Sequence, residues 1–213
     1  WGDSQRAALD RALQGDGNFG DEFTGIGQTD RGNCVVTGAI KAGMDHFGNK
    51  IFTDVKPNDN GGYDITMRDG YKVSLTKEEM EAAATGAHYD GKDPESLAYA
   101  QMAYAAAAKR AYEEKNDGAR TFSEALLALN DGAFAKDGIH WLGLDNNYKK
   151  VPLDDLKGRD SLVIDGNGHV FYAADRNGQV MSDHWGEAHA WDPTGEFKSD
   201  DYFKPDGAYQ IVG

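Results

Sequence analysis

Cysteine is almost absent from this sequence: Cys34 is the single one in 213 residues. A lone cysteine excludes an internal disulfide and leaves too few ligands for a structural zinc site, even with His184 close to His189. The fold therefore depends on its core, and the thiol stays available for chemistry. We expect a cytoplasmic protein, or a secreted effector that acts in a reducing compartment.

Positive charge is also scarce, with 22 Lys and Arg against 36 Asp and Glu, for a net charge of -14. Nucleic acid and anionic membranes would repel so acidic a chain. No stretch approaches the roughly 18 apolar residues of a membrane-spanning helix. The sequence thus predicts neither a nucleic-acid nor a membrane partner. High solubility explains the charge best, and basic substrates are the other interpretation.

The hydrophobic pattern predicts an α+β fold. A chain of 213 residues with 39% hydrophobic residues can bury one sizeable core, so we expect a single domain over 1–213. Helical spacing marks 3–14, 34–47, 94–115 and 121–130, and Thr76 with Glu79 forms a capping box for another helix. Strand patterns mark 51–55, 63–67 and 71–75, and dominate again beyond about residue 138.

Cys34 stands where a Gly-bearing loop enters the helix predicted at 34–47. Helix N-termini favour negative charge, so this thiol should ionise more easily than a free thiol of pKa about 8.5. Six residues earlier, Gln28 can point its amide at the oxygen of an acyl group under attack, beside the Cys34 N–H. The competing interpretation is a small, buried, inert cysteine.

His169 is the best candidate for the base that a nucleophilic cysteine needs. It opens a predicted strand after an Asp-Gly-Asn-Gly turn, and antiparallel pairing with the next strand should bring Asp183 near it. Asp183 would then orient the imidazole, as the third residue of a triad does. His169 can also be read as a strand-edge residue bonded to its turn, and His184 as an alternative base or a surface residue.

These segments together resemble a papain-fold cysteine peptidase, closest to the calpain-like branch. The segment from Gln28 to Cys34 resembles the calpain pattern Gln-Gly-x-x-Gly-Asp-Cys, with Asn33 in place of Asp. The segment starting at Gly168 resembles the family's Gly-His-Ala, and 183–186 resembles Asn-Pro-Trp-Gly or Asn-Ser-Trp-Gly. The closing strand 206–211 also fits, so the similarity spans most of 20–213.

The resemblance implies a two-lobe fold, with a mainly helical lobe and a hairpin over about 1–135 and an antiparallel β lobe over about 136–213. The central helix would carry the nucleophile. The implied activity is peptide-bond cleavage by Cys34, His169 and Asp183, with Gln28 in the oxyanion hole. Two positions depart from the family: Val35 follows the cysteine in place of Trp, and Asp183 replaces Asn.

Several functions share this chemistry. The resemblance favours a thiol protease that acts as a monomer on protein or peptide substrates, with Trp185 shielding the contact between His169 and Asp183. A papain-fold deamidase or acyl transferase effector is the nearest alternative. A catalytically inactive papain-like binding module and a non-enzymatic acidic domain are the others.

No cofactor is expected. A calcium site at the acidic turns is conceivable, but Lys56 stands where the EF-hand spacing of 58–61 would need a ligand. Asp, Asn and Gly are also the residues that tight turns select, so turn formation is the better explanation.

Overall fold

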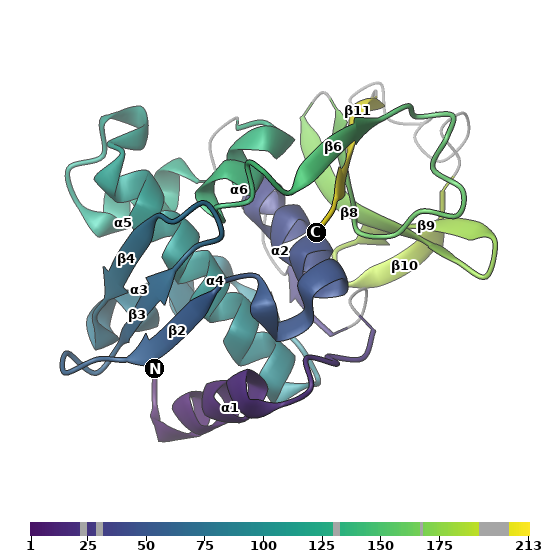
Figure 1. Ribbon diagram of the computed structural model, residues 1–213. Helices are drawn as coiled ribbons and strands as arrows, with labels where there is room; N and C mark the ends of the chain where they lie inside the picture. The colour runs from purple at the N-terminus through teal and green to yellow at the C-terminus, as the bar shows by residue number, and fades with distance from the viewer. Residues whose placement is uncertain (22–24, 29–31, 130–132, 167, 192–204) are drawn as a thin grey trace.

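The computed structural model describes residues 1–21, 25–28, 32–129, 133–166, 168–191 and 205–213. It is an α+β structure in which a group of helices lies beside an antiparallel sheet (Figure 1). The helices of the described part are α1 (Asp3–Gln14), α2 (Cys34–Phe47), α3 (Lys77–Ala87), α4 (Pro94–Glu113), α5 (Phe122–Ala128) and α6 (Ala135–Trp141). The four helices expected from periodicity are confirmed, with ends within two residues of expectation.

The second half of the chain forms a six-stranded sheet with the order β10-β9-β8-β7-β11-β6. Its strands are β6 (Tyr148–Val151), β7 (Leu162–Gly166), β8 (His169–Arg176), β9 (Gln179–His184), β10 (Glu187–Ala190) and β11 (Pro205–Ile211). Every neighbouring pair is antiparallel. As expected, His169 opens a strand, and it pairs with Gly166 across the turn.

A smaller sheet lies on the helical side, made of β2 (Asp54–Pro57), β3 (Tyr63–Thr66) and β4 (Lys72–Leu75). The strand expected at 51–55 begins later, because Ile51 and Phe52 follow a short 3-10 helix, η1 (Gly48–Lys50), and are buried in the core. Two further short strands pair with each other: β1 (Gly27–Gln28), in the loop that we expected before the helix at 34–47, and β5 (Tyr89–Asp90).

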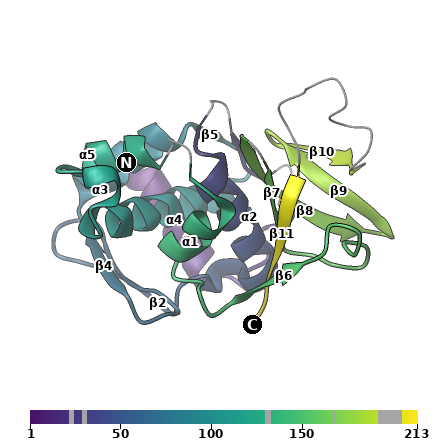
Figure 2. The same cartoon turned by 90° about the horizontal axis from the view of Figure 1, so that it is seen from above.

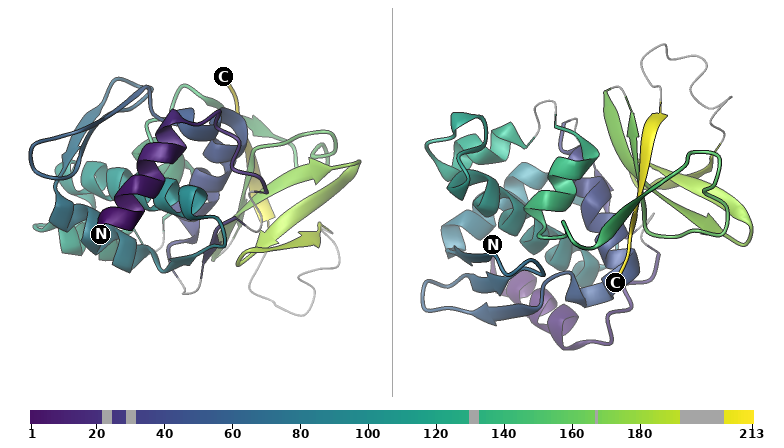
Figure 3. Two further views of the ribbon diagram at one scale, coloured as in Figure 1. Left: turned by 90° about the horizontal axis from the view of Figure 1, so that it is seen from below. Right: turned by 45° about the horizontal axis from the view of Figure 1, so that its top comes forward.

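Helix α2 is the centre of the molecule. Ten consecutive residues, 35–44, are buried, and Figures 2 and 3 show the helix between the other helices and the six-stranded sheet. On the sheet side, a Cβ on Gly38 would lie 3.3 Å from the carbonyl carbon of Phe171, a tight contact that the absence of a side chain relieves, so α2 approaches β8 closely. Cys34, the first residue of α2, is thereby brought to the sheet.

Local capping agrees with the sequence at α3, where Thr76 Oγ1 accepts from the Glu79 N–H at 3.2 Å and Glu79 accepts from the Thr76 N–H at 3.0 Å. The expectation that strands dominate beyond about residue 138 is confirmed, since in the described residues only strands, β6 to β11, follow Trp141. The short helix α6 just before them was not expected. Helix α6 has seven residues and contains Gly138, so its periodic signal is weak, yet Ile139 and Trp141 are buried.

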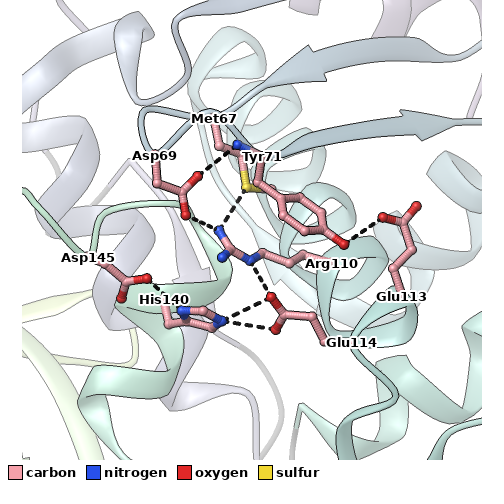
Figure 4. A network of polar contacts seen from close by, with 8 residues as sticks. All are labelled: Met67, Asp69, Tyr71, Arg110, Glu113, Glu114, His140 and Asp145. Carbon is pink, nitrogen blue, oxygen red and sulfur yellow. Dashed lines mark hydrogen bonds and ion pairs between the residues drawn. The ribbon is translucent and has the colours of Figure 1, made fainter.

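A polar network joins the small sheet, α4, α6 and the segment before β6 (Figure 4). Arg110 binds Asp69 at 2.5 Å and Glu114 at 2.9 Å. His140 lies between two carboxylates, with Nε2 2.9 Å from Glu114 and Nδ1 2.7 Å from Asp145. Burial alone lowers the pKa of His140, but its hydrogen bonds to Asp145 and Glu114 outweigh burial and raise it.

His140→Gln should therefore reduce stability in a pH-dependent way. Because the pKa of His140 is raised on folding, protonation stabilises the folded state fully below the ordinary value of about 6.5, and the gain is lost as pH rises through the raised pKa. Urea unfolding from pH 5 to 9 should show the largest difference from wild type at pH 5. A difference that grows with pH would contradict this electrostatic role.

Candidate functional site

Cys34 lies at the N-terminus of α2 against the beginning of β8. Burial raises the pKa of its thiol, hydrogen bonds with the backbone of Val170, Val35 and Cys34 itself lower it, and the charge of Asp165 raises it again. The net shift is upward, so the expectation of an easily ionised thiol was wrong for Cys34 in this environment. The backbone donors of the helix terminus are present, but desolvation of the thiolate outweighs them.

His169 immediately precedes Val170, whose backbone interacts with the Cys34 thiol. Its imidazole is stacked on Trp185, with ring centroids 5.7 Å apart and planes 28° apart, and Phe171 lies at the same centroid distance. The indole of Trp185 is 58% exposed. One face of the imidazole is therefore covered by an aromatic ring that also faces solvent.

Asp183 is held by a buried ion pair that the sequence did not predict. Its Oδ1 lies 2.9 Å from the Nζ of Lys41, and the two side chains are 9% and 1% exposed. The same oxygen accepts the N–H of Gly186 at 3.1 Å. Asp183 is thus fixed between α2 and its own turn, and its role in orienting His169 stays a prediction. The side chain of His184, the alternative base, lies outside the described part of the structure.

Gln28 is buried in β1, opposite Tyr89 of β5. The neighbouring Gly27 packs on the turn that follows β9, where a Cβ on Gly186 would lie 2.8 Å from the Gly27 Cα. Residues 29–31, between Gln28 and the start of α2, lie outside the described residues. The Gln28 strand is therefore in direct contact with the turn that follows β9 and carries Trp185.

Asn33 explains how the start of α2 is held. Its side-chain amide donates to the backbone carbonyl of Ala87 at 2.5 Å, and the backbone carbonyl of Asn33 accepts from the hydroxyl of Thr37 at 2.8 Å. Thr37 in turn contacts the hydroxyl of Tyr89, at 2.9 Å, on the strand that pairs with Gln28. An Asp at position 33, as in the calpain pattern, has no hydrogen to donate when it is ionised, so it could not bind the Ala87 carbonyl in this way.

The predicted site residues thus come from four segments that meet where the helices join the sheet. Cys34 contacts the strand that His169 opens, His169 stacks on Trp185, and the Trp185 turn packs on the Gln28 strand. Lys41 was missed. A lysine between the apolar residues Ile40 and Ala42 was the available signal of a buried charge, but its partner Asp183 is distant in the sequence.

No metal site is apparent in the described residues, where no group of three or more His, Cys, Asp or Glu is arranged to hold an ion. At the acidic turn considered for calcium, the side-chain oxygen Oδ1 of Asn58 accepts from the N–H groups of Asn60 and Gly62, at 3.0 and 3.1 Å. That turn is closed by its own side chain. Among the described residues, no helix has both the length and the hydropathy to cross a bilayer.

Comparison with known proteins found no matching family model, no matching curated protein and no matching solved structure. The papain-like assignment therefore depends on the motifs and on the geometry of this chain.

Gly186→Ala should disrupt the packing that joins β1 to the site. Gly186 has φ +95°, and its Cβ would meet the Gly27 backbone, whereas Gly178 has φ +85° with nothing within 4 Å. The matched variant Gly178→Ala should cost about 1–2 kcal/mol through its backbone conformation alone, and Gly186→Ala clearly more. Urea unfolding of both variants measures the difference, and equal costs would show that the Gly27 contact is unimportant.

Proposed function

We propose that the protein is a papain-like cysteine peptidase with Cys34 as nucleophile. The observation that carries the proposal is the placement of the only cysteine at the N-terminus of a buried helix, against the strand that begins with His169. The helices and the six-stranded sheet on either side of α2 would be the two lobes, with the substrate bound where they meet. The order of Gln28, Cys34, His169 and Asp183 along the chain is that of the family it resembles.

In the proposed reaction His169 removes the proton from the Cys34 thiol, and the sulfur attacks the carbonyl carbon of the substrate. The Gln28 amide and the Cys34 N–H stabilise the negative oxygen of the tetrahedral intermediate. His169 then gives the proton to the leaving amine, and the carbon–nitrogen bond breaks. Water, deprotonated by His169, hydrolyses the resulting thioester and restores the thiol.

The raised pKa of Cys34 makes the base essential to this proposal. Burial disfavours an isolated thiolate, so at neutral pH the thiol needs a partner that accepts its proton at close range. A thiolate beside an imidazolium is neutral as a pair and is much less penalised by burial. Trp185, stacked on His169, would limit access of water to that pair.

The raised pKa also favours one competing function. A thiol that stays protonated, together with Val35 and Asp183 at positions where the family has Trp and Asn, is what an inactive papain-like binding module would have. A deamidase or acyl transferase would use the same residues and differ in its acceptor. The two experiments that follow separate these functions.

Alkylation of Cys34 by iodoacetamide tests the thiol and its base directly, because the chain has no other cysteine. From pH 4 to 9, wild type should react well below the pH at which the denatured chain reacts, and His169→Ala should abolish that advantage. His46→Ala, an exposed histidine on the same helix, is the control. Labelling only at the pH of an ordinary thiol, or only after unfolding, would contradict the peptidase proposal and leave the binding module.

Turnover should identify the reaction. Wild type mixed with unfolded proteins should create new amino termini without releasing ammonia, and Cys34→Ala should create none. Gln28→Ala should retain activity reduced by ~10²–10³, the usual effect of losing one oxyanion donor, while the exposed Gln14→Ala should match wild type. Release of ammonia without new termini would favour the deamidase instead.

A further inference from the structure

We propose that Lys41 is a positioning residue of this site. By pairing with Asp183, it holds the third residue proposed for the His169 imidazole in place and balances its negative charge. The inference deepens the proposed function and rests on it. It gives a role to a buried charge that neither the motifs nor the core accounts for. It also explains why this chain has Asp where the family it resembles has Asn.

The geometry ties Asp183 to the helix of the nucleophile. Lys41 lies seven residues after Cys34 in α2, which is two helical turns, so the two residues share one face of the helix. The Lys41 Nζ is 2.9 Å from the Asp183 Oδ1. Any movement of α2 relative to β9 would therefore be resisted by a direct contact between them.

Burial makes each charge dependent on the other. The Lys41 side chain is 1% exposed and that of Asp183 is 9% exposed. Removing one member of such a pair strands the other charge in a poorly solvated site, whereas replacing both with neutral groups of similar size is often tolerated. Asp183 with Lys41 thus carries the same net charge as an asparagine, while Oδ1 stays held by Lys41 and the Gly186 N–H. The second oxygen, Oδ2, is the acceptor that the proposal assigns to His169.

Other carboxylates also face this region. Asp21 lines a small cavity together with Lys41 and Ser96, Asp165 acts on the Cys34 thiol, and Asp90 lies beside Gly27. All three are unchanged in the variants that test the proposal. Differences between those variants therefore report the charge balance of Lys41 and Asp183.

The experiment is the pH dependence of Cys34 alkylation by iodoacetamide in wild type, Asp183→Asn and the double variant Lys41→Met with Asp183→Asn. Asp183→Asn removes the negative charge that faces Lys41 and makes this region more positive by one unit, which disfavours the imidazolium of the thiolate–imidazolium pair. Its alkylation should begin at a pH higher by roughly one unit or more. The double variant restores a neutral pair, so its profile should return close to that of wild type.

The exposed pair of Lys56 with Asp54, 2.7 Å apart, is the matched control. Asp54→Asn, alone and with Lys56→Met, makes the same chemical changes on the small sheet and should leave the alkylation profile unchanged. Thermal unfolding should show Asp183→Asn below both wild type and the double variant. A pair that only holds α2 to the sheet would affect unfolding and leave the pH profile in place.

An Asp183→Asn profile identical to wild type, or a double variant that keeps the shifted profile, would overturn the inference while leaving the peptidase proposal intact. If Asp183→Asn fails to fold, a double variant that folds with the wild-type profile supports the inference, and one without His169-dependent labelling overturns it. A wild-type profile that His169→Ala does not change would instead overturn the peptidase proposal, and this inference with it.

Discussion

The close packing of α2 is the constraint on which the rest of the structure depends. The helix is approached closely from two sides at glycines: Gly38 faces the backbone of β8, and a Cβ on Gly138 of α6 would lie only 2.5 Å from the Val35 carbonyl oxygen. Helices can approach a sheet or another helix this closely only when the intervening side chain is absent. The first turn of α2 is thereby fixed between α6 and the strand that His169 opens. The position of the Cys34 thiol follows from this packing.

The same packing decides the electrostatics of the site. A helix N-terminus in water would lower the pKa of a thiol, but here burial raises the pKa of Cys34. Deeper along the helix, burial of Lys41 is possible because Asp183 comes from the sheet to meet it. The raised pKa of Cys34 and the pairing of Lys41 with Asp183 both reflect the cost of an isolated buried charge, and the same cost applies to the pair proposed for Cys34 and His169. One physical rule, the cost of an isolated buried charge, governs both.

The sequence was informative where the signal is local. Helix periodicity predicted α2 and α4, and the Thr76–Glu79 box predicted the start of α3. It failed where structure comes from distant contacts: β1 and β5 have two residues each, and their pairing depends on chain segments far apart. Lys41 was missed for the same reason. A lysine among apolar residues has no recognisable role until the fold shows that Asp183 lies beside it.

Each departure from the calpain pattern has a matching contact in this chain. Asn33 donates to Ala87, Val35 packs on Gly138 of α6, and Asp183 is balanced by Lys41. A buried ion pair adds little stability compared with an apolar pair of similar volume, while the loss of one partner is costly. A module that only had to fold would gain by replacing both with apolar residues. Under the peptidase proposal, the pair next to the His169 strand has a role in the chemistry of the site that the stability of the fold does not require.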